Sequence, residues 1–164
     1  MKKIAIATLL TAFFAAPAVA AEAYIGINAG QNKMDFSGVK ASTAIGVFGG
    51  YSFNEYIAGE LAYVDFGSAD VDGGGSVKGY ATSIAAVGSW PLAKEFSLFA
   101  KLGYASTEVK DGTSESKSDV TYGIGGQYNA TSNIGIRLGY DNYRVGDTTT
   151  KDSALTTLGV LYKF

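Results

Sequence analysis

One pattern constrains this chain more than any other: eight segments alternate between large apolar residues and small or polar ones. In the first segment Ala23, Ile25 and Ile27 alternate with Tyr24 and Gly26. A period of two is typical of a β-strand whose two faces meet different surroundings. Eight such segments at nearly even spacing predict an all-β domain in which each strand runs antiparallel to the next.

The eight predicted strands cover most of the chain after its first twenty residues. They lie at 23–30, 44–53, 57–64, 80–90, 96–105, 120–128, 134–141 and 155–164. Connections after the second, fourth and sixth strands are short. The other connections, for example Gly67–Lys78 and Glu108–Ser118, are longer and rich in Asp, Gly, Ser, Thr and Lys. We therefore expect short turns at one rim of the sheet and long polar loops at the other.

Residues 1–20 have the composition of a cleaved signal peptide. Lys2 and Lys3 precede an apolar run at 4–14, and the small residues at 18–20 form a cleavage pattern. The apolar run is too short for a membrane-spanning helix, which needs about 20 residues. Residues 21–164 are then predicted to form one exported domain.

Several function classes are disfavoured by the composition of the chain. There is no cysteine and no histidine, so a disulfide framework and histidine-based acid–base catalysis are excluded. Without residues 1–20 the chain has 11 basic and 15 acidic residues and no basic run, which argues against nucleic acid as a partner. Asp70 and Asp72 lie in a glycine-rich stretch and are interpreted as a solvated turn. We predict no catalytic residue, no cofactor and no metal site.

Charged residues in the predicted strands indicate which face of the sheet points into the barrel and which points outward. A soluble barrel directs its apolar set inward, and a membrane barrel directs it to lipid. Glu60, Lys101, Arg137 and Asp141 all fall in the set opposite the aliphatic residues, together with most of the glycines. A narrow barrel has room inside for small and paired charged residues, so Ile, Leu, Tyr and Phe are expected outside. The prediction is an eight-stranded antiparallel up-and-down transmembrane β-barrel, which pairs every backbone polar group within lipid.

Aromatic residues on the apolar face are expected at two levels. One predicted girdle, at the long-loop ends, contains Tyr63, Tyr80, Tyr104, Tyr122 and Tyr140, and the other, at the short-turn ends, contains Phe53, Trp90, Phe96, Tyr128 and Phe164. Tyr80 and Trp90 are ten residues apart in the sequence, or roughly 23 Å in height for a tilted strand. Girdles at such a separation are typical of the two lipid–water boundaries.

Three stretches carry a resemblance to a known family. Gly46–Gly67 (GVFGGYSFNEYIAGELAYVDFG), Phe99–Tyr104 (FAKLGY) and Gly135–Tyr143 (GIRLGYDNY) resemble the transmembrane domain of OmpA-type proteins and, more widely, OmpX-like small barrels. The final strand resembles the C-terminal targeting strand of outer-membrane barrels, through Leu158, Val160, Tyr162 and Phe164. The resemblance implies an outer-membrane location, with the N-terminus and short turns periplasmic and the long loops extracellular. Because the chain ends at the barrel, no peptidoglycan-binding domain is expected.

The resemblance also implies a charged cluster in the barrel lumen. By motif position its members are Glu60, Lys101, Gln127 and Arg137, and Asp141 is expected nearby. Gln127 stands where the family commonly has an acid, and Val87 where a second lumen base is typical. We expect Glu60 and Arg137 to pair, because an ionised group in a narrow lumen needs a counter-ion. Two roles stay open for the cluster, a structural charge network and a gate.

The expected function is that of a non-enzymatic barrel of the Gram-negative cell envelope. It would support envelope integrity and make adhesion-type contacts through its long loops, with a lumen largely closed by side chains. The alternative is a narrow porin-like channel for ions or small solutes. Expected partners are outer-membrane lipids and lipopolysaccharide, the barrel-assembly machinery through the C-terminal strand, and a possible surface ligand.

Overall fold

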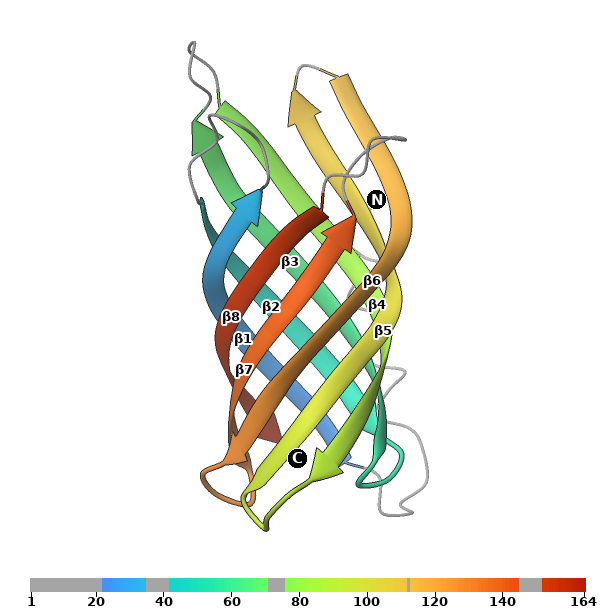
Figure 1. Ribbon diagram of the computed structural model, residues 1–164, viewed down its shortest axis with the longest axis vertical. Helices are drawn as coiled ribbons and strands as arrows, with labels where there is room; N and C mark the ends of the chain where they lie inside the picture. Colours follow the sequence, from blue (N-terminus) through green and yellow to red (C-terminus); the bar gives the residue numbers. More distant parts are fainter. Residues whose placement is uncertain (1–21, 35–41, 71–75, 112, 145–151) are drawn as a thin grey trace.

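The computed structural model describes residues 22–34, 42–70, 76–111, 113–144 and 152–164. They form eight strands that close into a single antiparallel barrel (Figure 1). The strands are β1 (Glu22–Met34), β2 (Ser42–Ser52), β3 (Ile57–Asp70), β4 (Ser76–Pro91), β5 (Phe96–Asp111), β6 (Thr113–Asn129), β7 (Ile134–Arg144) and β8 (Asp152–Lys163). The fold class predicted from the alternation is confirmed. The predicted signal peptide lies outside the described residues and stays a prediction.

Each strand pairs with its neighbour in the chain, and β8 pairs back to β1, so the sheet has no edge along the shared length of the strands. Following directly opposed residues once around the barrel from Tyr24 leads to Met34, ten residues farther along β1. Such a stagger requires strands that tilt strongly against the barrel axis. Figure 1 shows this tilt in all eight strands.

Several strands reach farther than their alternation predicted. Apart from residue 112, which lies outside the described part, the residues expected in the polar loop Glu108–Ser118 belong instead to β5 and β6, which pair from Phe96–Tyr128 to Asp111–Thr113. That loop prediction was wrong, because a ladder of backbone hydrogen bonds continues through polar residues that have no apolar face. In the second predicted loop, Gly67–Lys78, β3 and β4 also extend and pair as far as Asp70 and Ser76. Residues 71–75 lie outside the described part.

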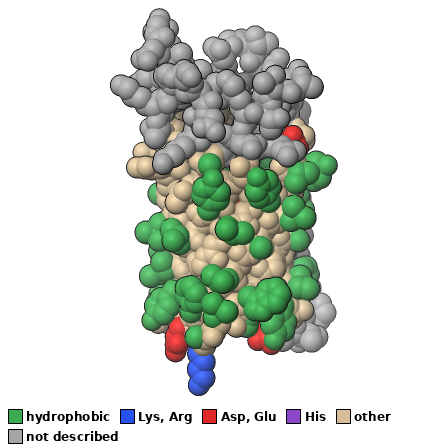
Figure 2. All heavy atoms as spheres, in the orientation of Figure 1, with side chains coloured by type: hydrophobic (Ala, Val, Ile, Leu, Met, Phe, Trp, Pro, Cys, Tyr) green, Lys and Arg blue, Asp and Glu red, His purple; other side chains and the backbone are tan. Residues whose placement is uncertain are grey.

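The outward face of the barrel carries large apolar side chains. Figure 2 shows hydrophobic side chains gathered toward both ends of the described wall, with no charged side chain between them on that face. Among the exposed outward residues are Ile27, Ile84, Leu102, Ile124 and Leu158. Burial alternates along β2, where Ala44, Gly46 and Phe48 are buried. The described part of the chain contains no helix long and apolar enough to cross a membrane.

The interior holds more apolar side chains than the sequence suggested. Two clusters of buried residues fill it at different levels. The cluster toward the long-connection ends of the strands contains Ala44, Val64, Phe66, Ala81, Ala105, Tyr143 and Leu155. The cluster toward the short-turn ends contains Tyr24, Phe48, Ala58, Val87, Phe99 and Leu161. We call them the upper and lower apolar layers. The expectation that Leu, Tyr and Phe lie only outside was therefore wrong.

Candidate functional site

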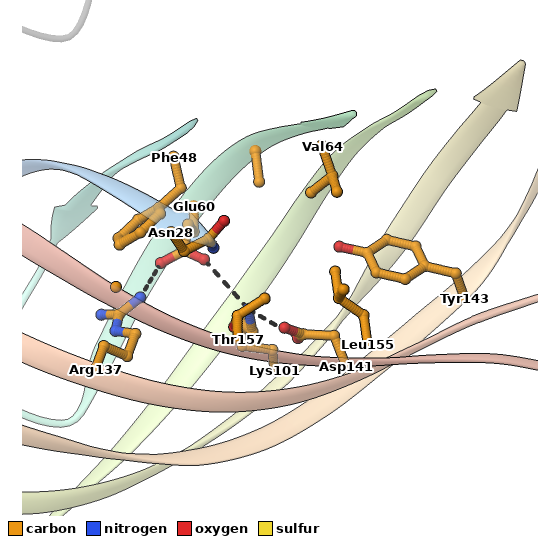
Figure 3. A pocket seen from close by; sticks show the side chains of 12 residues that line it. Asn28, Phe48, Glu60, Val64, Lys101, Arg137, Asp141, Tyr143, Leu155 and Thr157 are labelled. Carbon is orange, nitrogen blue, oxygen red and sulfur yellow. Dashed lines mark hydrogen bonds and ion pairs between the residues drawn. The ribbon is translucent and has the colours of Figure 1, made fainter. Parts of the chain in front are cut away.

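A chain of four charged side chains crosses the lumen between the two apolar layers (Figure 3). Arg137 Nη1 donates to Glu60 Oε2 at 2.5 Å. Lys101 Nζ lies 3.6 Å from Glu60 Oε1 and 2.8 Å from Asp141 Oδ1. Glu60 is the centre of this chain, since it faces both cations and its side chain is only 3% exposed. Two positive and two negative groups balance, so the buried network carries no net charge.

The neighbouring strands explain how Glu60 is held. Tyr24 on β1 donates its hydroxyl hydrogen to Glu60 Oε2 at 2.9 Å. Tyr24 reaches Glu60 across β2, at the point where Gly50 lies between them and directly opposite each. A Cβ atom at position 50 would collide with the phenol ring of Tyr24, so the contact depends on this glycine. A carboxylate taken out of water needs such donors to replace hydration. Glu60 therefore has three partners from three different strands.

Arg137 is surrounded on all sides. Its Nε and Nη2 both donate to Gln127 Oε1, at 3.1 and 2.9 Å. Gln127 lies on β6, directly opposite Arg137. Its guanidinium carbon lies 5.3, 5.0 and 4.8 Å from the ring centroids of Tyr24, Phe48 and Phe99. Such distances allow cation–π attraction, which strengthens when the pair is desolvated. The guanidinium is thus fixed by one carboxylate, one amide and three rings.

Glycines opposite two of these rings make the aromatic cage possible. Phe48 faces Gly26 across the β1–β2 ladder, and Phe99 faces Gly125 across the β5–β6 ladder. A Cβ at either glycine would collide with the ring opposite. Sequence reasoning missed the cage, although a glycine that faces a phenylalanine in the inward set is the signal that could have found it.

An apolar residue stands at the position where the resemblance implies a second lumen base. Val87, which stands at the expected position, is buried in the lower apolar layer. Lys101 lies directly opposite Val87 in the β4–β5 ladder, so a lumen base lies at the same level on the neighbouring strand. Asp141, from β7, then gives Lys101 its nearest counter-ion. All five residues of the predicted cluster, Gln127 included, lie together.

The lumen leaves little free space around these groups. Two cavities of about 10 Å³ each lie beside Glu60, Lys101 and Asp141, which is near the lower limit for one water molecule. Asn28 Oδ1 is buried there without a hydrogen-bond partner in the described part of the chain. The arrangement can hold buried charges in fixed pairs. It offers no group of three or more acidic side chains that could bind a metal among the described residues.

The residues predicted for the girdles lie on the outer surface. All are exposed except Tyr80, which is half-buried and stacks on Tyr63 with a 6.4 Å ring separation. Trp90 is 75% exposed. In the predicted targeting strand, Leu158, Val160, Tyr162 and Phe164 all face outward and are exposed. The backbone N–H of Phe164 donates to the carbonyl of Ala23 at 3.0 Å, which extends the β1–β8 pairing to the last residue.

Comparison with known proteins agrees with this architecture. The family described as outer membrane protein beta-barrel domain matches residues 5–164. Outer membrane protein A of Serratia marcescens is 30% identical over 144 residues, which cover 76% of this chain but 40% of that protein. The chain thus spans less than half the length of this curated relative.

Solved structures that share the fold include two bacterial surface proteins. Ail, the attachment invasion locus protein of Yersinia pestis, is 22% identical with a TM-score of 0.61, and the match covers 89% of this chain and 100% of Ail. Ail has also been solved in complex with the heparin analogue sucrose octasulfate. Neisserial surface protein A is 18% identical with a TM-score of 0.62, covering 91% of this chain and 100% of that chain.

Proposed function

Because this chain belongs to the outer membrane protein β-barrel domain family, we propose that it is a structural barrel of the cell envelope that makes surface contacts. The short turns and the N-terminus would face the periplasm and the long hairpins the exterior. This orientation is supported by the difference between the two rims, since outer-membrane barrels have short periplasmic turns and longer extracellular connections. We infer no enzymatic activity, because the buried charges are engaged with one another.

The observation that carries this proposal is the projection of the β5–β6 hairpin. Pairing between β6 and β7 ends at Thr121–Tyr143, whereas pairing between β5 and β6 continues to Asp111–Thr113. Among the described residues, no strand pairs with the other edge of 113–120. That edge is about 26 Å long at a rise of about 3.3 Å per residue. Unpaired backbone N–H and C=O groups on such an edge can accept an extended peptide segment as an additional strand.

The partners proposed for this barrel follow from its surfaces. The outward apolar side chains fit membrane lipid, and the tyrosine girdle at the long-loop ends of the strands fits the headgroup region, including lipopolysaccharide. The exposed apolar set of β8 suits recognition by the barrel-assembly machinery. A surface ligand would be met by the projecting hairpin. Ail, which shares the fold, binds a sulfated sugar analogue, so sulfated polysaccharide is one probe worth testing here.

A shortened hairpin tests the surface role. Ser106 and Ser118 lie directly opposite each other in the β5–β6 ladder, so residues 107–117 can be replaced by a two-residue Asn-Gly turn. A strain that lacks the protein is complemented with either form. We expect both forms to restore resistance to detergent, and only the full-length hairpin to restore adhesion to heparin-coated surfaces or cultured epithelial cells. Equal adhesion with both forms would refute a role for the hairpin.

One observation favours the alternative of a narrow channel. Glu60 lies near both Arg137 and Lys101. In a channel, the Glu60 carboxylate would break its ion pair with Arg137, pair with Lys101 alone, and leave a path for ions beside Arg137. Against this, Arg137 has Gln127 and three aromatic rings as further partners. Planar bilayer recordings decide between the two. A channel should keep its conductance when the hairpin is shortened, whereas the structural barrel should show none.

A further inference from the structure

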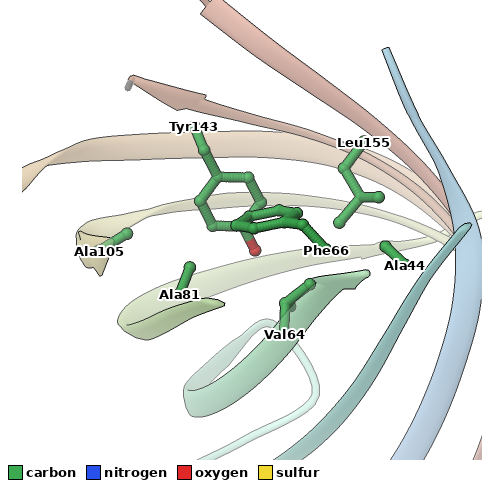
Figure 4. Close-up of a cluster of buried hydrophobic side chains, with 7 residues drawn as sticks. All are labelled: Ala44, Val64, Phe66, Ala81, Ala105, Tyr143 and Leu155. Carbon is green, nitrogen blue, oxygen red and sulfur yellow. The ribbon is translucent and has the colours of Figure 1, made fainter. Parts of the chain in front are cut away.

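The upper apolar layer lies between the buried charges and the long-connection end of the lumen. Its seven residues come from six strands, β2, β3, β4, β5, β7 and β8, so it spans most of the barrel cross-section. Figure 4 shows the rings of Phe66 and Tyr143 meeting in its centre, with the smaller members around them. The two rings are 5.6 Å apart and nearly perpendicular. Leu155, which is 1% exposed, fills the space beside them.

A β-bulge fixes Phe66 in this layer. The β3–β4 register shifts between Asp65 and Ser68, and Gly67 has a φ of 72°. Asp65 Oδ1 accepts the N–H of Gly67 at 2.8 Å, and Ser42 Oγ donates to the carbonyl of Phe66 at 2.8 Å. Hydrogen bonds therefore hold both polar groups of the peptide that links Phe66 to Gly67. Bulges often serve to redirect a side chain at the rim of a barrel.

The charged groups lie directly beneath this layer. Asp141 and Lys101 line the same small cavity as Tyr143. Strands β3 and β7 both run from a short turn toward a long connection. Tyr143 comes two residues after Asp141 on β7, and Phe66 comes six residues after Glu60 on β3. Both rings therefore lie nearer the long-connection end than the charges do. Among the described residues, the side chains of this layer therefore lie between that end and the buried ion pairs, and half-buried Asp119, directly opposite Ala105 on β6, is a charged residue at the level of the layer itself.

We propose that the upper apolar layer is a lid that seals the lumen from the exterior, and that Phe66, Tyr143 and Leu155 set access to the buried charges. Apolar constrictions exclude ions by dewetting even when no atom blocks them completely. The ion pairs then stabilise the closed lumen without acting as its outer gate. This inference rests on the closed lumen and the orientation proposed above, and it is independent of what the β5–β6 hairpin binds.

Cysteine accessibility tests the lid. The chain has no cysteine, so Ala62→Cys introduces a unique thiol on β3 that faces the cavity beside Glu60 and Lys101. A charged, membrane-impermeant methanethiosulfonate is added outside sealed vesicles. Ser118→Cys, at an exposed position near the outer end of β6, reports orientation and reagent activity. We expect the thiol at position 62 to be protected, and Phe66→Ala or Leu155→Ala to raise its labelling rate by about tenfold or more, equivalent to about 1.4 kcal/mol in the free energy of access.

Two matched controls separate the lid from general loosening and from an ionic gate. Leu161→Ala removes the same side chain from the lower layer, and Leu161 is also 1% exposed and on β8. Added to Ala62→Cys, Leu161→Ala or Glu60→Ala should leave external labelling slow. Each variant must first show the heat-dependent shift in gel mobility of a folded barrel, and the two lid variants provide independent chances of folding. Fast labelling of Ala62→Cys alone, or equal acceleration by Leu155→Ala and Leu161→Ala, would overturn the proposal even if the surface role holds.

Discussion

Replacing Glu60 by alanine is the sharpest test of the buried charge network. The change removes the acceptor of Arg137 at 2.5 Å and of Tyr24 at 2.9 Å. Lys101 keeps its ion pair with Asp141 at 2.8 Å, whereas Arg137 loses its carboxylate partner. Breaking a buried pair by removing one partner costs about 3–5 kcal/mol. Because Gln127 and the aromatic rings still hold the guanidinium, we expect a loss near the lower limit, about 3 kcal/mol.

The measurement is reversible urea unfolding in lipid vesicles. Trp90 is the only tryptophan in the chain and lies exposed on the outer face, so its fluorescence reports contact with lipid. Asp141→Ala is the matched control, since Lys101 then still has Glu60 at 3.6 Å and Arg137 is untouched. We expect a smaller loss for this control. The double variant Glu60→Ala/Arg137→Ala should be less destabilised than the sum of the two single variants. Additive losses, or a larger loss for Asp141→Ala, would refute the central role of Glu60.

Four further outcomes are expected. Leu102→Arg places a charge on the lipid face and should cost about 2–4 kcal/mol in the same unfolding assay; a neutral result would contradict the assignment of that face. Gly67→Ala should cost about 1–2 kcal/mol, because an alanine Cβ is disfavoured at positive φ. Deletion of Phe164 removes its hydrogen bond to Ala23 and should slow insertion, measured as the rate at which the heat-modifiable form appears. In planar bilayers we expect no steady conductance from the parent or from Glu60→Ala; a steady, ohmic conductance that Glu60→Ala left unaltered would count against an ionic gate.

Most of the fold could be predicted from the alternation of residue types, because a period of two assigns every strand residue to one of two faces. Ile27 and Leu102 were predicted outside, and Glu60 and Arg137 inside, from parity together with the placement of the charged residues, and their exposure in the structure matches. The same parity placed four charged residues, from β3, β5 and β7, in one lumen. Parity does not say which of them touch, and the link from Lys101 to Asp141 required the register of the barrel.

The misses have two physical causes. Polar residues after Thr107 give no apolar face to detect, yet backbone pairing continues to Asp111, so the hairpin could not be distinguished from a loop by composition. The interior aromatic residues were missed because a narrow barrel was assumed to admit only small or charged side chains. Space for Phe48 and Phe99 comes from glycines on the adjacent strands, and that compensation becomes visible only when strands are aligned in register.

Pairing of β1 with β8 has a consequence for the biogenesis of this protein. Tyr24 lies opposite Lys163, and the backbone N–H of Phe164 donates to the carbonyl of Ala23, so β1 cannot complete its pairing until β8 has been synthesised. Until then both terminal strands would present unpaired edges, which favour aggregation. The barrel can therefore close only once β8 is available to pair with β1, however fast the individual hairpins form.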